Sequence, residues 1–203
     1  MLKSEADKAI PEALLLRETG YDFEWLHHAF TFEKKKKGTA LRTNGSRDGI
    51  AVVDIGGGKK VSVDFRRFYE ADPMEQVCIV KRGVNARLVD VLAESMQMPK
   101  GKLISALGLS AASLQRKSSV QAALSSNESS RVVGMGKLIG QAQVMVEESG
   151  EADGFDPAVW VGHWLDQPVP ALSGGRPCDL MDTAEGQAVV SQLLGRLRSG
   201  VYA

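Results

Sequence analysis

The spacing of apolar residues changes character twice along the chain. In Val61-Ser-Val-Asp-Phe65 apolar and polar residues alternate, as expected of a strand with one buried face. Three consecutive glycines, Gly56 to Gly58, come just before this run. We therefore predict a β-hairpin in which Gly49 to Ile55 pairs with Lys59 to Phe65.

From about residue 84 the apolar spacing becomes helical. Leu88, Val91 and Leu92 share one face of a predicted helix. A long helix is predicted from Ser125 to about Glu148. Its first residues, Ser125-Ser-Asn-Glu128, fit a capping box, in which the serine and glutamate side chains satisfy free backbone N–H groups. A segment rich in glycine and acidic residues, 149–156, ends it.

The predicted fold class is mainly α. A small N-terminal α/β extension contains the hairpin and two further predicted helices, at about Glu5 to Thr19 and Asp22 to Lys36. Two more helices follow the long one and flank the connector Pro168-Val-Pro-Ala-Leu-Ser-Gly-Gly-Arg-Pro177. Its prolines and glycines fix the chain direction, so the last helix and its end should project in one direction.

Residues 99–117 have the spacing of a helix-turn-helix motif. A short helix is predicted to end at a tight turn at Gly108, and Ser110 caps a second helix. Leu103, Leu107 and Leu114 should pack beneath the two helices. The candidate DNA-binding residues are the polar and cationic side chains of these two helices: Lys100, Lys102, Ser110, Ser113, Gln115, Arg116 and Lys117. An ordinary helical hairpin with a solvated basic face remains the alternative.

The charge distribution favours the DNA interpretation. The chain of 203 residues has a net charge of zero, but the charges are not evenly spread. Between Lys81 and Val120, seven Lys and Arg residues face two acidic residues, a net charge of +5. After residue 120, five cations face ten acidic residues, a net charge of −5. Two surfaces of opposite sign suggest two partners of different chemistry.

Composition and local motifs exclude several classes of function. No apolar run approaches the roughly 20 residues that span a bilayer, and the N-terminus lacks a signal-peptide pattern, so we expect a cytoplasmic protein without a membrane partner. Cys78 and Cys178 lack metal-ligand or redox-motif spacing, so we expect buried thiols, no disulfide, no metal and no cofactor. No paired carboxylate, Cys/His or Ser/His arrangement stands out, so no enzyme activity is expected.

Other local patterns are interpreted structurally. Lys34 to Lys37 is a solvated helix end more often than a nucleic-acid contact, and Gly56-Gly-Gly-Lys-Lys60 lacks the spacing of a phosphate-binding loop. His27, His28 and His163 have no metal-ligand spacing. Trp160 and Trp164, at i and i+4, form an apolar stripe, and at least one of them should be a core residue.

From about Arg82 to Ala203 the chain resembles the antitoxins of the Xre/MbcA/ParS type, which pair with RES-domain toxins. The resemblance covers about 120 residues and lies in the order of these short motifs: Arg82-Gly-Val84, Leu88 to Glu94, Leu107-Gly-Leu-Ser110, Leu114-Gln-Arg-Lys117, Leu124-Ser125, Glu128-Ser129, Trp164-Leu165, Pro170 to Pro177, Leu180-Met-Asp-Thr183, Gly186, Val190, Leu193-Leu194, Arg196 and Gly200-Val-Tyr-Ala203. Residues 1–75 lie outside it.

The resemblance implies an antitoxin of a type II toxin–antitoxin system with three regions. Residues 1–75 are an extension of unknown role, 76–122 a helix-turn-helix region for DNA binding and dimerisation, and 123–203 a toxin-binding domain. Its C-terminal end would block the active site of an NAD⁺-degrading RES toxin, and its dimer would bind the operator of its own operon. The implied toxin-binding residues are Trp164, Arg176, Arg196, Arg198, Gly200, Val201, Tyr202 and Ala203. A stand-alone helix-turn-helix transcription regulator without a toxin is the alternative.

Overall fold

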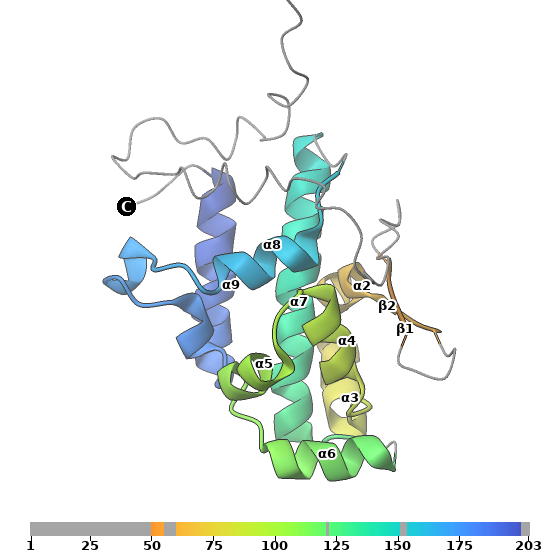
Figure 1. Ribbon diagram of the computed structural model, residues 1–203. Helices are drawn as coiled ribbons and strands as arrows, with labels where there is room; N and C mark the ends of the chain where they lie inside the picture. Colours follow the sequence, from red (N-terminus) through yellow and green to blue (C-terminus); the bar gives the residue numbers. More distant parts are fainter. Residues whose placement is uncertain (1–49, 55–59, 121, 151–153, 200–203) are drawn as a thin grey trace, which may run out of the picture.

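The computed structural model describes residues 50–54, 60–120, 122–150 and 154–199. Within these ranges the protein is mainly helical, as the sequence predicts (Figure 1). The strands β1 (Ile50–Asp54) and β2 (Lys60–Asp64) pair antiparallel, with Val52 opposite Ser62, which confirms the hairpin to within a residue at each end. The predicted helices at 5–19 and 22–36, the lysines 34–37 and the turn at Gly56 to Gly58 lie outside the described residues.

Two helices that the periodicity did not indicate follow the hairpin. Helix α2 (Phe65–Glu70) starts where the predicted strand was to end, and α3 (Pro73–Arg82) comes after a one-turn break. Asp72 accepts hydrogen bonds from the backbone N–H groups of Met74 and Glu75, and Pro73 occupies the first turn, where a missing N–H costs nothing. These local signals define the start of α3.

The helix-turn-helix region comprises α4 (Leu88–Ser95), α5 (Lys100–Ala106) and α6 (Ala111–Ser119). The long helix α7 (Ser126–Ser149) follows, and the capping box predicted at Ser125 and Glu128 is present. Helix α8 (Pro157–Trp164) and two 3-10 turns, η3 (Pro170–Leu172) and η4 (Pro177–Leu180), lead to the last helix, α9 (Ala184–Ser199).

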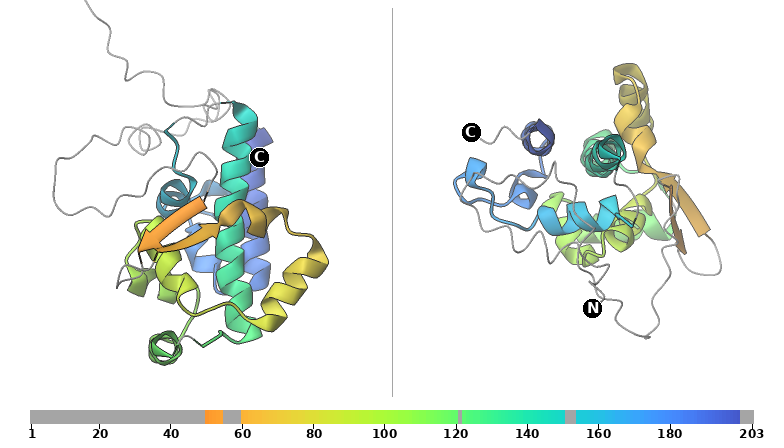
Figure 2. Two further views of the ribbon diagram at one scale, coloured as in Figure 1. Left: turned by 90° about the vertical axis from the view of Figure 1, so that its right-hand side faces the viewer. Right: turned by 90° about the horizontal axis from the view of Figure 1, so that it is seen from above.

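Helix α7 is the axis of the fold. It contacts α2, α3, α4, α8 and α9, and the views in Figures 1 and 2 show α9 running alongside it and α8 crossing it. Val132, Met135, Leu138 and Ile139 of α7 are all at most 2% exposed and belong to one core cluster with residues from both flanking regions. The helix-turn-helix region and the C-terminal segment thus share one hydrophobic core.

Two glycines let α2 lie directly on α7. A Cβ atom at Gly140 would stand 2.2 Å from the carbonyl oxygen of Phe65, and one at Gly136 would stand 3.0 Å from the ring of Phe68. Contacts as short as the first do not occur between real atoms, so any side chain at residue 140 would push the two helices apart. Phe65, at 2% exposed, fills the space beside this crossing. Residues 65–82 are therefore part of the folded body rather than an appendage.

Candidate DNA-binding and toxin-binding surfaces

The turn between α5 and α6 has the geometry that the sequence predicts. Gly108 adopts a φ of 56°, a left-handed conformation that favours glycine, and Ser110 caps α6 by accepting a hydrogen bond from the N–H of Ser113. Leu103, Leu107 and Leu114 are at most 2% exposed. They join the two helices to the core, which confirms the predicted packing beneath the motif.

Arg131 of α7 holds this turn in place. Its guanidinium Nη1 donates hydrogen bonds of 2.8 Å to the carbonyl oxygens of both Leu107 and Gly108. These carbonyls lie at the end of α5, where helix C-termini leave backbone oxygens without partners and attract cations. The orientation of the motif is thereby tied to the central helix.

The lysines among the candidate DNA-binding residues form ion pairs within the chain. Lys100 pairs with Asp90, Lys102 with Asp166 and Lys117 with Glu128. The prediction that Lys117 faces solvent on α6 holds only in part, because its ammonium pairs with Glu128. Lys117 lies beside the start of α7 and is only 24% exposed. Arg116, by contrast, is exposed on α6.

The polar candidates of the motif differ in how available they are. Gln115 is exposed, whereas Ser113 is half-buried. Ser110 is exposed, but its hydroxyl oxygen is the cap acceptor of α6. The structure therefore leaves Arg116 and Gln115 as the side chains best placed to meet a nucleic acid.

Glu128 links α6 to α7 through two sets of hydrogen bonds. Its carboxylate accepts from the backbone N–H and the hydroxyl of Ser125 and also meets the ammonium of Lys117. Burial alone would raise the pKa of Glu128, but the hydrogen bonds from Lys117 and Ser125 outweigh it and lower the pKa to about 2. The carboxylate is therefore ionised throughout the neutral range.

Trp164 is a core residue. It is 3% exposed and its ring stacks on that of Trp160, with centroids 5.9 Å apart and planes at 6°. Both rings belong to the core cluster, in line with the apolar stripe at i and i+4. The expectation of Trp164 at the toxin-binding surface must be corrected, because in this structure it supports α8 from inside.

The connector between α8 and α9 folds back on itself. The N–H of Val169 bonds to the carbonyl of Gly175, and that of Cys178 bonds to the carbonyl of Leu165. Arg176 is exposed and donates to Asp179, and this hydrogen bond raises the pKa of Arg176 and lowers that of Asp179. The connector is thus a hydrogen-bonded unit with a charged outer edge.

Helix α9 carries the remaining candidates for toxin binding. Val190, Leu193 and Leu194, each at most 5% exposed, hold it in the core. Arg196 is exposed. Nothing is described of the Arg198 side chain, and Gly200 to Ala203 lie outside the described residues. The structure therefore leaves the role of the chain end a prediction.

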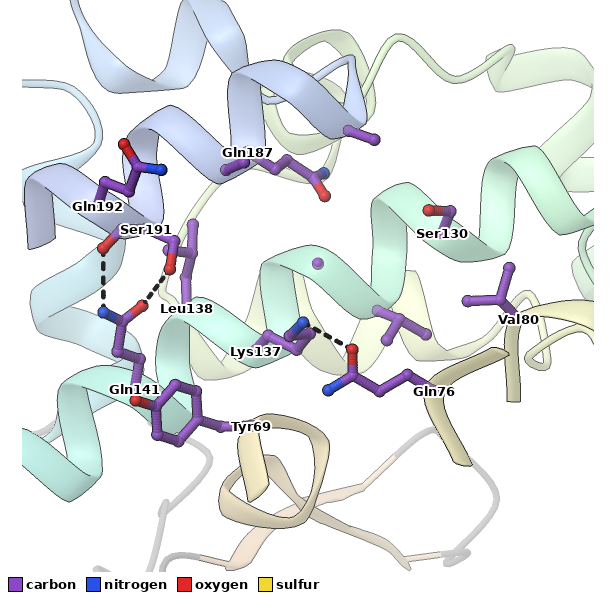
Figure 3. Close-up of a pocket in the computed structure, with 14 residues that line it drawn as sticks. Tyr69, Gln76, Val80, Ser130, Lys137, Leu138, Gln141, Gln187, Ser191 and Gln192 are labelled. Carbon is purple, nitrogen blue, oxygen red and sulfur yellow. Dashed lines mark hydrogen bonds between the residues drawn. The ribbon is translucent and has the colours of Figure 1, made fainter. Parts of the chain in front are cut away.

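A groove that the sequence did not indicate lies between α3 and α9 (Figure 3). It has a volume of about 460 Å³, and α7 forms its floor. Lys137 on the floor donates a hydrogen bond of 2.8 Å to Gln76 of α3, while Gln141 is hydrogen-bonded to Ser191 of α9. The signal in the sequence is the pair of small residues one turn apart on α9, Ala184 and Ala188, which line this groove.

The two cysteines occupy different environments. Cys178 is buried, and burial raises the pKa of its thiol to about 11, with the nearby charge of Asp179 adding to the effect. Cys78 is exposed on α3, so the expectation that it is buried is wrong. Both thiols are free. Within the described ranges, no group of His, Cys, Asp and Glu could hold a metal ion, and no helix could cross a membrane.

Comparison with known proteins gives the family. Residues 78–135 match the antitoxin Xre-like helix-turn-helix domain, and residues 153–200 match the antitoxin Xre/MbcA/ParS C-terminal toxin-binding domain. A protein of Sphingobium sp. (strain YBL2), named Prs ADP-ribosylating antitoxin, is 42% identical over 139 residues, which span 68% of this chain and 87% of that protein. The chain belongs to this family of antitoxins.

A second relative of the antitoxin is more distant. The protein named Antitoxin Xre from Yersinia enterocolitica (serotype O:8 / biotype 1B, strain NCTC 13174 / 8081) is 24% identical over 124 residues, or 61% of this chain and 78% of that protein. The two matched domains of the antitoxin include α4, α5 and α6 in the first and α8 and α9 in the second. Helix α7 begins in the first domain and connects it to the second, whereas α2 and the first half of α3 precede both.

Proposed function

We propose that the antitoxin neutralises an NAD⁺-consuming RES-domain toxin by binding it and inserting the C-terminal end into its active site. The observation that carries this proposal is the match of residues 153–200 to a toxin-binding domain, because α9 within it leads directly into Gly200 to Ala203. The name of the Sphingobium relative supports an NAD⁺-consuming partner. ADP-ribosylation takes its ADP-ribose group from NAD⁺, so a toxin with that activity needs an NAD⁺ pocket.

The geometry of α9 suits such a mechanism. Val190, Leu193 and Leu194 fix the helix against the core, so its last turn has a defined direction. An aromatic residue on a short arm, here Tyr202, buries a large apolar area while ordering few rotamers, and the carboxylate of Ala203 suits cationic groups that hold nucleotide phosphates. In this mechanism the antitoxin is a steric inhibitor and performs no chemistry itself.

Co-expression with the toxin in cells tests this mechanism. The chain lacking residues 198–203 should remain folded, because it keeps the buried Val190, Leu193 and Leu194 of α9, but should no longer protect cells from the toxin. A Tyr202→Ala variant should lose part of the protection. Protection by the truncated chain equal to that of the full chain would show that the C-terminal end does not block the toxin.

We further propose that the antitoxin regulates its own operon by binding operator DNA as a homodimer in the cytoplasm. The match of residues 78–135 to an Xre-like helix-turn-helix domain supports DNA binding, and a dimer would present two copies of α6 to successive major grooves. Arg116 and Gln115, exposed on α6, are the proposed contacts to DNA. A gel shift on the upstream DNA at several salt concentrations tests this part separately.

A further inference from the structure

The groove between α3 and α9 combines exposed apolar side chains on its flanking helices with a half-buried lysine on its floor. Figure 2 shows the two helices on opposite sides of α7, and residues from α2, α3, α7 and α9 line the space between them (Figure 3). On the α9 side, the small side chains of Ala184 and Ala188 are among those that line it. Its length follows α7 from Ser130 to Gln141, about three helical turns.

The helices beside this groove carry exposed apolar side chains, of which Tyr69 lines the groove itself. Within the described residues, the large hydrophobic side chains that are exposed are Tyr69, Met74, Val77, Val120 and Val189. All except Val120 belong to α2, α3 or α9. Helix α3 buries none of its residues, although its sequence includes Met74, Val77, Ile79 and Val80. A helix with this composition and no buried residue is typical of a surface that a partner covers.

Lys137 gives the groove a specific charge requirement. Its ammonium is half-buried on the floor, where burial lowers the pKa of the group. The acceptor it reaches is the neutral amide oxygen of Gln76, and no carboxylate of the described residues pairs with it. A cation removed from water without a counter-charge is unfavourable, so a carboxylate brought by a partner would be strongly preferred over any other group.

We propose that the groove between α3 and α9 receives an amphipathic helix of the toxin, with one Asp or Glu of that helix pairing with Lys137. This inference rests on the proposed function, because it takes the toxin as the partner. Helix α9 forms one wall and lies inside the matched toxin-binding domain, so one side of the groove belongs to that domain. Apolar residues at helical spacing around one acidic residue would match the groove.

The proposal extends toxin binding beyond the matched domain. Tyr69 of α2 and Gln76 and Val80 of α3 line the opposite wall, and the first two precede both family matches. The toxin would therefore hold α3 and α9 at once, with α7 between them. This arrangement assigns residues before the helix-turn-helix domain a role in recognising the toxin.

Affinity measurements on the full chain test the proposal. The probe is a RES-domain toxin, which the proposed function expects to be encoded beside the gene, made inactive by mutation and titrated by calorimetry. Ala188→Arg fills the groove and should weaken binding at least about tenfold, and Lys137→Met should weaken it by about tenfold, as expected for residues central to an interface. Because Lys137→Met removes a poorly compensated cation, the melting temperature of this variant should equal or exceed that of the wild type.

The controls separate this proposal from the proposed function. Ala112→Arg makes the same change on the exposed side of α6, away from the groove, and should bind the toxin like the wild type. Unchanged affinity in both groove variants, with the wild type binding, would overturn the groove proposal alone. If the wild type does not bind the probe, the proposed function fails as well. A third outcome is that the groove variants change the oligomeric state measured by light scattering but keep the toxin affinity. The groove would then bind a second copy of the antitoxin, and the proposal would be overturned.

Discussion

Cations are paired differently at the start of α7 and near its middle. At its start, Lys117 of the helix-turn-helix motif pairs with Glu128, and Lys100 and Lys102 of the same motif also have carboxylate partners. Near its middle, Lys137 meets only the neutral amide of Gln76. The first arrangement stabilises a fixed motif, because each charge is satisfied within the chain. The second leaves the charge of Lys137 without a carboxylate partner among the described residues. A toxin carboxylate can supply that partner, which is why we propose that the groove binds the toxin.

The comparison also explains what periodicity could and could not predict. The turn at Gly108, the cap at Ser110 and the capping box at Ser125 and Glu128 are local, so short sequence patterns contain them. The ion pair between Lys102 and Asp166 joins residues 64 positions apart, and the packing of α2 depends on Gly136 and Gly140 far along the chain. Such long-range contacts leave no local pattern.

The candidate site was predicted in outline rather than in detail. The family resemblance indicated both domains and both partners but implied Trp164 as a toxin contact, and the helix-turn-helix pattern placed Lys100, Lys102 and Lys117 among the candidate DNA contacts. Burial and ion pairing correct these assignments, since neither property can be determined from residue type alone. The start of α3 could have been found from Asp72-Pro73 and Glu75, which form a capping box.

The largest expected effect on stability comes from replacing a glycine at the crossing of α2 and α7, and a glycine in α5 of the helix-turn-helix region is its control. Gly140→Ala places a Cβ 2.2 Å from the Phe65 carbonyl and should lower the free energy of unfolding by about 3 kcal/mol, because α2 must move. Gly101→Ala in α5 meets nothing within 4 Å and should raise it by about 0.5 kcal/mol. Urea unfolding measures both. Equal effects of the two substitutions would contradict the close α2–α7 packing.

A smaller effect is expected from the ion pair at the start of α7. Since the pKa of Glu128 is about 2 in the folded chain, its contribution to stability is present above its unfolded pKa of roughly 4.5 and is lost as the pH falls towards 2. Glu128→Gln should lower the free energy of unfolding at pH 7 by about 1 kcal/mol and should flatten this acid-side dependence. Thermal unfolding from pH 7 to pH 2 measures both.

Glu185→Gln is the control for this change. It makes the same change of a carboxylate to an amide at an exposed residue in the first turn of α9 and leaves the pair of Glu128 with Lys117 in place. If Glu128→Gln and Glu185→Gln gave the same pH profile as the wild type, the ion pair with Lys117 would not stabilise the fold.

The smallest effect distinguishes the two neighbouring cations of α6. Arg116→Ala should weaken operator binding several-fold and reduce the slope of log affinity against log salt by about one, because an exposed cation that meets a phosphate releases a counterion. Lys117→Ala should change this slope less and should mainly lower the melting temperature, because it breaks the pair with Glu128. Gel shifts at several salt concentrations and thermal unfolding compare them. An equal loss of slope in both variants would place Lys117 at the DNA.

The central proposal is that the chain end blocks an NAD⁺-consuming toxin while the rest of the antitoxin holds it. Measuring binding and inhibition in the same sample tests this proposal most directly. Active toxin is mixed with the full chain or with the chain lacking residues 200–203, and both complex formation and NAD⁺ consumption are recorded. We predict that the shortened chain still forms the complex but leaves NAD⁺ consumption largely intact. Full inhibition by the shortened chain at the same occupancy would contradict the account.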